Sequence, residues 1–323
     1  MRQSDGTALG QKRWPKDDHF VASATFLKEK SIKIDPINLM SMAFYCVIGC
    51  GYVGTTAATH FKYQGHHITG TTKSRDKLLA LSEVVHDPLI VDIANAATEF
   101  DFLEHQDGLL ISVAPSREGQ SFEDVFGTGI TRLVEALKHR RSTHPLHVTY
   151  ISTAGVYGDQ DGKAVCETSP LDLRHPLNAL LSAAEDALQS IDRDDTSICI
   201  LRIGGIYGPG RDMAHAIKAA AGEQIKKNGD HICAWTNIVD IAEGLSFAYT
   251  NQLQGIFNLV DDMQLTRRQL SNQICDIDGL PPVLWMNNDR PGQRITHAKV
   301  SNSKIKLAGY DLKSPSMLAS LHV

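Results

Sequence analysis

From Ala43 onward, short apolar runs alternate with longer segments of helical periodicity. In the 122–140 segment, for example, apolar residues recur at spacings of three and four, as one buried helix face requires. This alternation predicts strand–helix units and therefore an α/β fold with a doubly wound parallel sheet. The predicted strands span 44–49, 67–71, 89–92, 108–113, 147–152 and 197–203, and the predicted helices span about 52–64, 75–82, 122–140 and 177–190.

The two ends of the chain depart from this alternation. Residues 1–42 mix charges of both signs without any apolar period, which predicts an N-terminal extension. The extension is compatible with a dispensable arm, a targeting segment or an upstream translation artefact before Met42. Its acidic residues argue against a mitochondrial transit peptide. We expect a dinucleotide-binding domain over 43–205, and a smaller C-terminal substrate lobe over 206–323 that partly returns to the first domain.

Composition narrows the class of partner. The 323 residues are 42% hydrophobic and 21% charged, which is typical of a globular protein. A net charge of −5 gives no positive field for nucleic acid or an anionic membrane, and no apolar run is long enough to span a bilayer. The 6 cysteines form no CxxC pair, which fits reduced thiols in the cytoplasm. We therefore expect a small-molecule substrate, with a homodimer left open.

The motif that carries most chemistry is the glycine loop after the first predicted strand. Gly49, Gly51 and Gly54 form a GxGxxG sequence, with Cys50, Tyr52 and Val53 at the intervening positions. In a strand–turn–helix context these glycines permit the tight turn, the approach of a pyrophosphate and close helix packing. The pattern predicts a Rossmann fold that binds a nicotinamide dinucleotide, with Cys50 simply occupying a variable position.

The end of the second predicted strand indicates which dinucleotide binds. NAD-binding folds usually place an acidic residue there to bind the ribose 2′-hydroxyl. Here no acid appears before Asp76, whereas hydroxyl and basic side chains are plentiful: Thr71, Thr72, Lys73, Ser74 and Arg75. This set favours the 2′-phosphate of NADP, although NAD stays possible, because the basic residues are also compatible with a solvated helix end.

Two later segments complete a recognisable set. Residues 150–158 read YISTAGVYG, and 201–210 read LRIGGIYGPG. With the glycine loop, they resemble the extended short-chain dehydrogenase/reductase superfamily, the NAD-dependent epimerase/dehydratase group, over about 43–320. The resemblance implies that Asp92 contacts adenine and that Ala114 and Pro115 lie along the cofactor ribose.

The resemblance fails at the residues that usually carry the reaction. The family polarises the substrate oxygen with a Ser or Thr, which Thr153 matches, and uses a Tyr four residues before a Lys as acid/base. Leu177 and Leu181 occupy those two positions, and no Tyr in the sequence has Lys four residues later. The chain thus resembles the atypical branch of the superfamily, which keeps the cofactor fold without the full catalytic set.

Three other side chains are candidates to supply a proton. Tyr157 and Tyr207 follow the fifth and sixth predicted strands, and His175 precedes the altered helix with an intrinsic pKa near neutrality. Each also has a structural interpretation, as a packing tyrosine or a solvent-facing loop histidine. The histidines show no HxxxH or HxH spacing, so no metal site is expected.

Two functions therefore remain. The first is an NADP-binding oxidoreductase or epimerase-like enzyme that acts on a small polar substrate beside Thr153. The second is a catalytically inactive NADP-binding sensor or regulator. Both use the same fold and differ only in chemistry.

Overall fold

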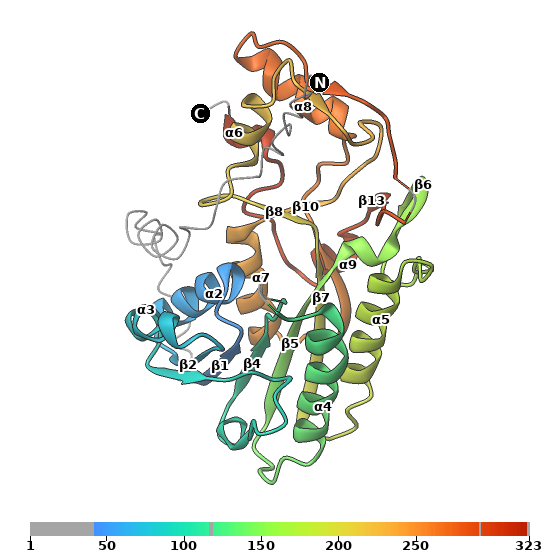
Figure 1. Cartoon of the computed structure of the whole chain (residues 1–323). Coiled ribbons are helices and arrows are strands. Elements are labelled where there is room, and N and C mark those ends of the chain that lie inside the picture. The colour runs from blue at the N-terminus through green and yellow to red at the C-terminus, as the bar shows by residue number, and fades with distance from the viewer. Residues whose placement is uncertain (1–41, 116–118, 291, 322–323) are drawn as a thin grey trace, which may run out of the picture.

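A computed structural model of the chain describes residues 42–115, 119–290 and 292–321. Its centre is a seven-stranded parallel sheet in the order β11-β7-β5-β4-β1-β2-β3 (Figure 1). The strands are β1 (Phe44–Ile48), β2 (His67–Thr72), β3 (Asp87–Ile90), β4 (Gly108–Ile111), β5 (Leu146–Thr153), β7 (Thr196–Ile203) and β11 (Gly255–Leu259). The order reverses between β1 and β4, where a doubly wound sheet opens its ligand crevice.

Apolar side chains on successive strand residues point to opposite faces of the sheet, so the sheet supports two cores. In β1, Tyr45 and Val47 join one core, whereas Cys46 and Ile48 join the other. The first core is covered by α2 (Tyr52–Tyr63), α3 (Leu78–Val84), α7 (Ile238–Thr250) and α9 (Ser303–Leu307). The second is covered by α4 (Ile130–Lys138) and α5 (Pro176–Gln189), on the other side of the sheet in Figure 1.

Beyond the carboxyl ends of the strands lies a smaller group of elements, at the top of Figure 1. It contains α6 (Met213–Lys218), α8 (Arg267–Ile277), and the parallel pairs β8 (Gly205–Tyr207) with β10 (Trp235–Asn237) and β9 (Gln224–Ile225) with β12 (Leu284–Trp285). A further pair joins β6 (Asp159–Val165) to β13 (His297–Val300). These elements place late parts of the chain above the sheet edge where β1 and β5 end.

The predicted fold class is confirmed, and the differences are local. All the predicted strands occur in the sheet, but β3 begins and ends two residues before its predicted bounds of 89–92. The sheet also contains β11, which the sequence analysis did not predict. The predicted helix over 122–140 begins as a π-helical segment, η3 (Glu123–Gly129), before α4. The predicted N-terminal extension covers residues 1–42, and all of it except Met42 lies outside the described residues.

Candidate functional site

The glycine loop has a geometry that only glycine satisfies at two of its three positions. Gly49 has a φ of +92°, and a Cβ there would lie 2.5 Å from the Ser112 carbonyl oxygen. A Cβ on Gly54 would lie 2.2 Å from the Gly49 carbonyl oxygen. At Gly51, by contrast, a Cβ would meet no atom within 4 Å, so this position opens onto space at the start of α2. The loop therefore presents a cradle that a ligand can approach closely.

The intervening residues of the loop serve the fold. Cys50 is buried, and burial raises the pKa of its thiol to about 12, so the thiol is unreactive at neutral pH. Val53 joins the first core. The Tyr52 hydroxyl donates a 2.5 Å hydrogen bond to the Pro209 carbonyl oxygen, and the Arg211 guanidinium lies 4.4 Å from the ring centroid. Tyr52 thereby ties α2 to the turn that follows β8.

The hydroxyl and basic residues at the end of β2 and just beyond it divide into two groups. Thr71 Oγ1 accepts a 3.0 Å hydrogen bond from the Gly49 amide, so this side chain supports the glycine loop. Thr72 Oγ1 accepts from the Ser74 amide at 3.2 Å. Lys73 and Arg75 are exposed and extend from the end of the strand. The end of β2 thus carries two exposed cationic side chains.

A single side chain, that of Gln120, links Asp92 to Lys73. Gln120 Nε2 donates to both Asp92 carboxylate oxygens at 3.1 Å, while Gln120 Oε1 accepts from Lys73 Nζ at 2.9 Å. The Asp92 carboxylate also accepts from the Ala94 amide at 3.1 Å. Ala114 and Pro115 follow β4 on the neighbouring strand end, with Ala114 exposed and Pro115 half-buried. The residues expected along the adenosine are thus spread over the ends of β2, β3 and β4.

Thr153 is the last residue of β5 and begins the short 3-10 segment η4 (Ala154–Tyr157). Its Oγ1 accepts a 3.0 Å hydrogen bond from the Gly155 amide, which fixes the side chain at the strand end. The preceding residue, Ser152, donates to the buried Glu185 carboxylate of α5, which also pairs with Arg202 of β7 at 2.5 Å. A buried ion pair therefore anchors the strand end that carries Thr153.

The two candidate tyrosines are both buried and hydrogen-bonded within the protein. The Tyr157 hydroxyl donates to Asn258 Oδ1 at 2.8 Å and accepts from Arg202 Nη1 at 3.0 Å. The Tyr207 hydroxyl donates to the Ser314 carbonyl oxygen at 3.3 Å. Burial raises the pKa of both phenols. Their side chains are 0% and 3% exposed, so the structure places both in packed surroundings.

His175 occupies a different environment at the start of α5. It is half-buried, and its Nδ1 accepts a 3.2 Å hydrogen bond from the Leu177 amide, which caps the helix before Pro176. Leu181, one turn beyond Leu177, is 5% exposed and packs with the apolar cluster of Val125, Phe126 and Val156. Leu177 and Leu181, at the positions where the family pattern has a tyrosine and a lysine, are therefore apolar side chains that pack on η3 and η4.

The sequence of residues 45–259 matches the family described as the NAD dependent epimerase/dehydratase family. The chain belongs to this family. Its seven-stranded sheet agrees with solved structures of similar proteins. One is the dTDP-glucose 4,6-dehydratase DesIV from Streptomyces venezuelae with NAD and TYD bound, at a TM-score of 0.69, 19% identity and coverage of 86% of this chain and 94% of that one.

Two further relatives extend the comparison. The UDP-N-acetylglucosamine 4-epimerase from Methanobrevibacter ruminantium M1, in complex with UDP-N-acetylmuramic acid, gives a TM-score of 0.70 at 17% identity and covers 87% of this chain and 96% of that one. Protein YeeZ of Escherichia coli K12 is 24% identical over 280 residues, which is 84% of this chain and 96% of that protein. Membership of an NAD-dependent family supports a nicotinamide cofactor.

Arg294, which the sequence analysis did not single out, lies beside Thr153, and Asn178 in turn holds Arg294. Arg294 comes from the segment before β13, and its Nε donates a 2.7 Å hydrogen bond to Asn178 Oδ1 of α5. A Cβ on Gly155 would lie 2.6 Å from Arg294 Nη2 and 3.2 Å from Thr153 Oγ1. Arg290 and Arg294 flank Gly292 in the sequence and could both have been noted as candidate anion-binding residues. Only the folded chain shows that Arg294 is the one that reaches the end of β5.

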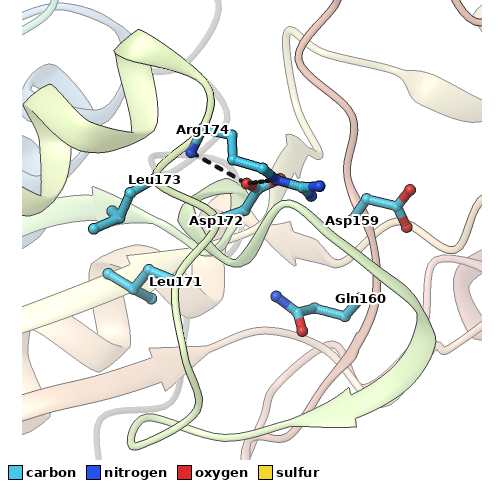
Figure 2. Close-up of a pocket in the computed structure, with 6 residues that line it drawn as sticks. All are labelled: Asp159, Gln160, Leu171, Asp172, Leu173 and Arg174. Atoms are coloured by element: carbon cyan, nitrogen blue, oxygen red, sulfur yellow. Dashed lines mark hydrogen bonds and ion pairs between the residues drawn. The ribbon is translucent and has the colours of Figure 1, made fainter.

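A surface hollow of about 540 Å³ lies next to this region (Figure 2). Arg174 pairs within it with Asp172 at 2.7 Å, and Gln160 donates to the Tyr157 carbonyl oxygen. Its lining residues are Asp159, Gln160, Leu171, Asp172, Leu173 and Arg174. Of its charged groups, Arg174 and Asp172 pair with each other, whereas Asp159 accepts a hydrogen bond from the Asp161 amide.

Two kinds of feature are absent from the part of the chain that the structure describes. Across residues 42–115, 119–290 and 292–321, no helix is long and apolar enough to cross a membrane. Within the same ranges, no group of three or more His, Cys, Asp or Glu side chains is arranged to hold a metal ion.

Proposed function

We propose that this family member binds NADP, with NAD as the weaker alternative, and acts on a small polar substrate held beside Thr153. The chemistry class is that of an oxidoreductase or an epimerase/dehydratase. The observation that carries the proposal is the space at Gly51, where a Cβ would meet nothing within 4 Å although Gly49 and Gly54 are tightly packed. A pyrophosphate fits such a loop at a helix N-terminus, because main-chain amides and the helix dipole favour an anion there.

We assign the 2′-phosphate, the adenine and the ribose of the cofactor to other residues of this chain. Lys73 and Arg75 are the groups for a 2′-phosphate, and Asp92 is the group for adenine, provided that Gln120 releases its carboxylate. Ala114 and Pro115 would line the ribose. The nicotinamide, when bound, supplies a centre that accepts or donates hydride. The residues of this chain bind and orient it through the loop and the strand ends.

Thr153 is the group proposed to hold the substrate oxygen. Among the three candidate proton donors, we carry His175 forward, because the hydroxyls of Tyr157 and Tyr207 are buried in hydrogen bonds with the protein. The Nδ1 of His175 caps α5, so its Nε2 is the nitrogen assigned to proton transfer. His175→Gln should then lower turnover without changing cofactor affinity.

A second candidate function is an NADP-binding sensor without turnover. The observation that favours it is the packing of Leu177 and Leu181, which provide neither a phenol nor an ammonium. Sugar nucleotides are the first substrates to assay, because the similar epimerase structure holds UDP-N-acetylmuramic acid. Turnover that Thr153→Ala removes, with cofactor affinity nearly unchanged, supports the enzyme. Binding of cofactor without turnover of any substrate favours the sensor.

The cofactor assignment is tested by fluorescence titration with NADPH and NADH. We expect tighter binding of NADPH, and a loss of about tenfold or more in its affinity in the Lys73→Ala, Arg75→Ala double variant, since hydrogen bonds to charged groups contribute about 1.5–3 kcal/mol each. NADH affinity should stay unchanged. Lys77→Ala, an exposed cation in the same turn, is the matched control.

Gly51→Val tests the loop itself. The side chain meets no protein atom within 4 Å of its Cβ, so the fold should be retained while both dinucleotides are excluded. Equal affinity of the wild-type protein for NADPH and NADH would contradict the 2′-phosphate assignment. Unchanged binding in Gly51→Val would contradict the cofactor site.

A further inference from the structure

The guanidinium of Arg294 is an unusual feature of the region around Thr153. Its Nε is held by Asn178, which is 1% exposed and is itself anchored by a 2.9 Å hydrogen bond from its Nδ2 to the Asp172 carbonyl oxygen. The Nη2 atom of Arg294 is buried and has no hydrogen-bond partner in the part of the chain that the structure describes. The hydrogen bond at Nε therefore orients the guanidinium, whereas Nη2 has no hydrogen-bond acceptor among the described residues.

No protein carboxylate offsets this charge among the described residues. Burial alone acts on the guanidinium, and it lowers the pKa of Arg294, whereas Arg174 and Arg202 each pair with an acid. A half-buried cation whose Nη2 is inaccessible and unpartnered costs stability, yet an arginine stays charged at any physiological pH. Such a group is explained when the missing partner is a ligand.

The position of the guanidinium shows what kind of ligand fits. Arg294 Nη2 and Thr153 Oγ1 both lie within 3.2 Å of the point where a Gly155 Cβ would be, so the two groups are neighbours over the bare backbone of Gly155. An anion on the arginine and an oxygen on the threonine would therefore belong to neighbouring atoms of one molecule. A carboxylate bonded directly to the carbon that bears the reacting oxygen has this arrangement, and a guanidinium binds carboxylates well.

We propose that Arg294, oriented by Asn178, binds the carboxylate of a 2-hydroxy or 2-oxo acid group whose adjacent oxygen is held by Thr153. This assignment deepens the proposed function and rests on it for the identity of the reaction. It gives the substrate a negatively charged end at the reacting carbon. It also gives Gly155 a specific role, because a side chain there would occupy the space of the guanidinium.

The experiment is calorimetric titration of the full-length protein with oxamate, a stable 2-oxo acid analogue, with and without NADPH. We expect oxamate to bind the wild-type protein and Arg294→Met to weaken it by about 10- to 100-fold, as the loss of a charged hydrogen bond predicts. Arg294→Lys should recover part of the affinity. Arg290→Met is the matched control, since Arg290 is an exposed arginine in the same segment.

A second variant guards against a failure of Arg294→Met to fold. Gly155→Ala places a methyl group 2.6 Å from Nη2 and should weaken oxamate binding by displacing the guanidinium. Circular dichroism and melting temperature establish that each variant is folded. Absence of oxamate binding to the wild-type protein, or equal binding in Arg294→Met, would overturn the proposal.

A titration with inorganic phosphate shows whether the site at Arg294 prefers a carboxylate or a phosphoryl group. Tighter binding of phosphate than of oxamate at Arg294 would mean that the site takes a phosphoryl group, and the carboxylate assignment would be wrong. The separate NADPH titration keeps the two proposals apart. Oxamate binding that depends on Arg294 in a protein that does not bind NADPH leaves the anion site standing while the proposed function fails.

Discussion

At the scale of single residues, the Asp261 carboxyl group is the clearest case of a side chain whose charge is set by burial. It is 3% exposed, and its Oδ1 accepts a 3.1 Å hydrogen bond from the Met263 amide. Burial raises the pKa of Asp261 to about 8. The group is therefore mostly protonated in the folded protein at neutral pH.

This leads to a pH-dependent stability with a definite sign. An aspartate in the unfolded chain loses its proton near pH 4, so between about pH 4 and pH 8 the folded state holds a proton that the unfolded state has released. The free energy of unfolding therefore falls as pH rises through this window. Asp261→Asn should remove that part of the slope and be more stable than the wild type near pH 8, as measured by urea unfolding.

The neighbouring carboxylate provides the control for this prediction. Although burial opposes it, hydrogen bonds from Asn302 and Lys306 lower the pKa of Asp262. A group with a lowered pKa contributes stability that is lost as pH falls, which is the opposite sign. Asp262→Asn should therefore lose stability at neutral pH relative to acid. Parallel pH profiles for the wild type and Asp261→Asn would refute the burial argument.

The sequence predicted some residues of the site and missed others, and the physical reason differs from residue to residue. Glycine positions could be predicted because their spacing is local, and a tight turn leaves few alternatives to glycine. Arg294 could not be predicted to lie beside Thr153, because the contact depends on the path of the chain between β12 and β13. Nor could the sequence show that Tyr157 lies against Arg202, since both tyrosine motifs are equally compatible with exposure.

At the scale of elements, the Glu185–Arg202 pair joins α5 to β7 beneath the Thr153 strand end. Both side chains are nearly inaccessible, at 1% and 2% exposure, and Arg202 also donates to the Tyr157 hydroxyl. Glu185→Ala leaves the arginine charge buried and unpaired, which typically costs about 3–5 kcal/mol. Chemical denaturation should show a loss of this size. Glu135→Ala, at an exposed pair with Lys138, should cost less than about 1 kcal/mol.

A loss in Glu185→Ala no larger than that in Glu135→Ala would show that the buried pair does not hold α5 to the sheet. The double variant Glu185→Met, Arg202→Met removes both charges together. It should be less destabilised than Glu185→Ala, because neither partner is left alone in the core.

Most strands were predictable, and the one that was missed has a physical explanation. The predicted strands are apolar runs in which both faces are buried, and such runs stand out from their surroundings. In β11 the run begins at Gly255 and is interrupted by Asn258, which is fully buried. Its side chain bonds the Tyr157 hydroxyl and the Ser301 carbonyl oxygen, so a polar residue is stabilised inside the sheet by distant partners. No local pattern predicts that.

At the scale of the whole molecule, the extension of residues 1–41 can be tested by deletion. The sequence has no apolar period there, and every described strand of the large sheet begins at or after Phe44. Removing these residues should leave melting temperature and NADPH affinity unchanged. Removing residues 1–48 instead deletes β1, the central strand between β2 and β4, and should prevent folding.

A lower melting temperature in the shorter deletion would mean that the extension stabilises the folded domain. A normal melting temperature with weaker NADPH binding would assign the extension to the cofactor site. Either result would change the domain boundaries predicted from the sequence, in which the dinucleotide-binding domain begins at residue 43.

The packing of α2 against α7 has a consequence for biosynthesis. Ala57 and Phe61 of α2 lie in the same core as Ile241 and Leu245 of α7, yet α7 is translated only after six of the seven strands of the large sheet. Until Ile238–Thr250 leaves the ribosome, the nascent glycine loop adjoins a helix with an uncovered apolar face. Ribosome-bound chains in which Ile238–Thr250 is still inside the exit tunnel should therefore recruit chaperones and remain sensitive to protease, whereas chains long enough to bring Leu259 outside the ribosome should become resistant.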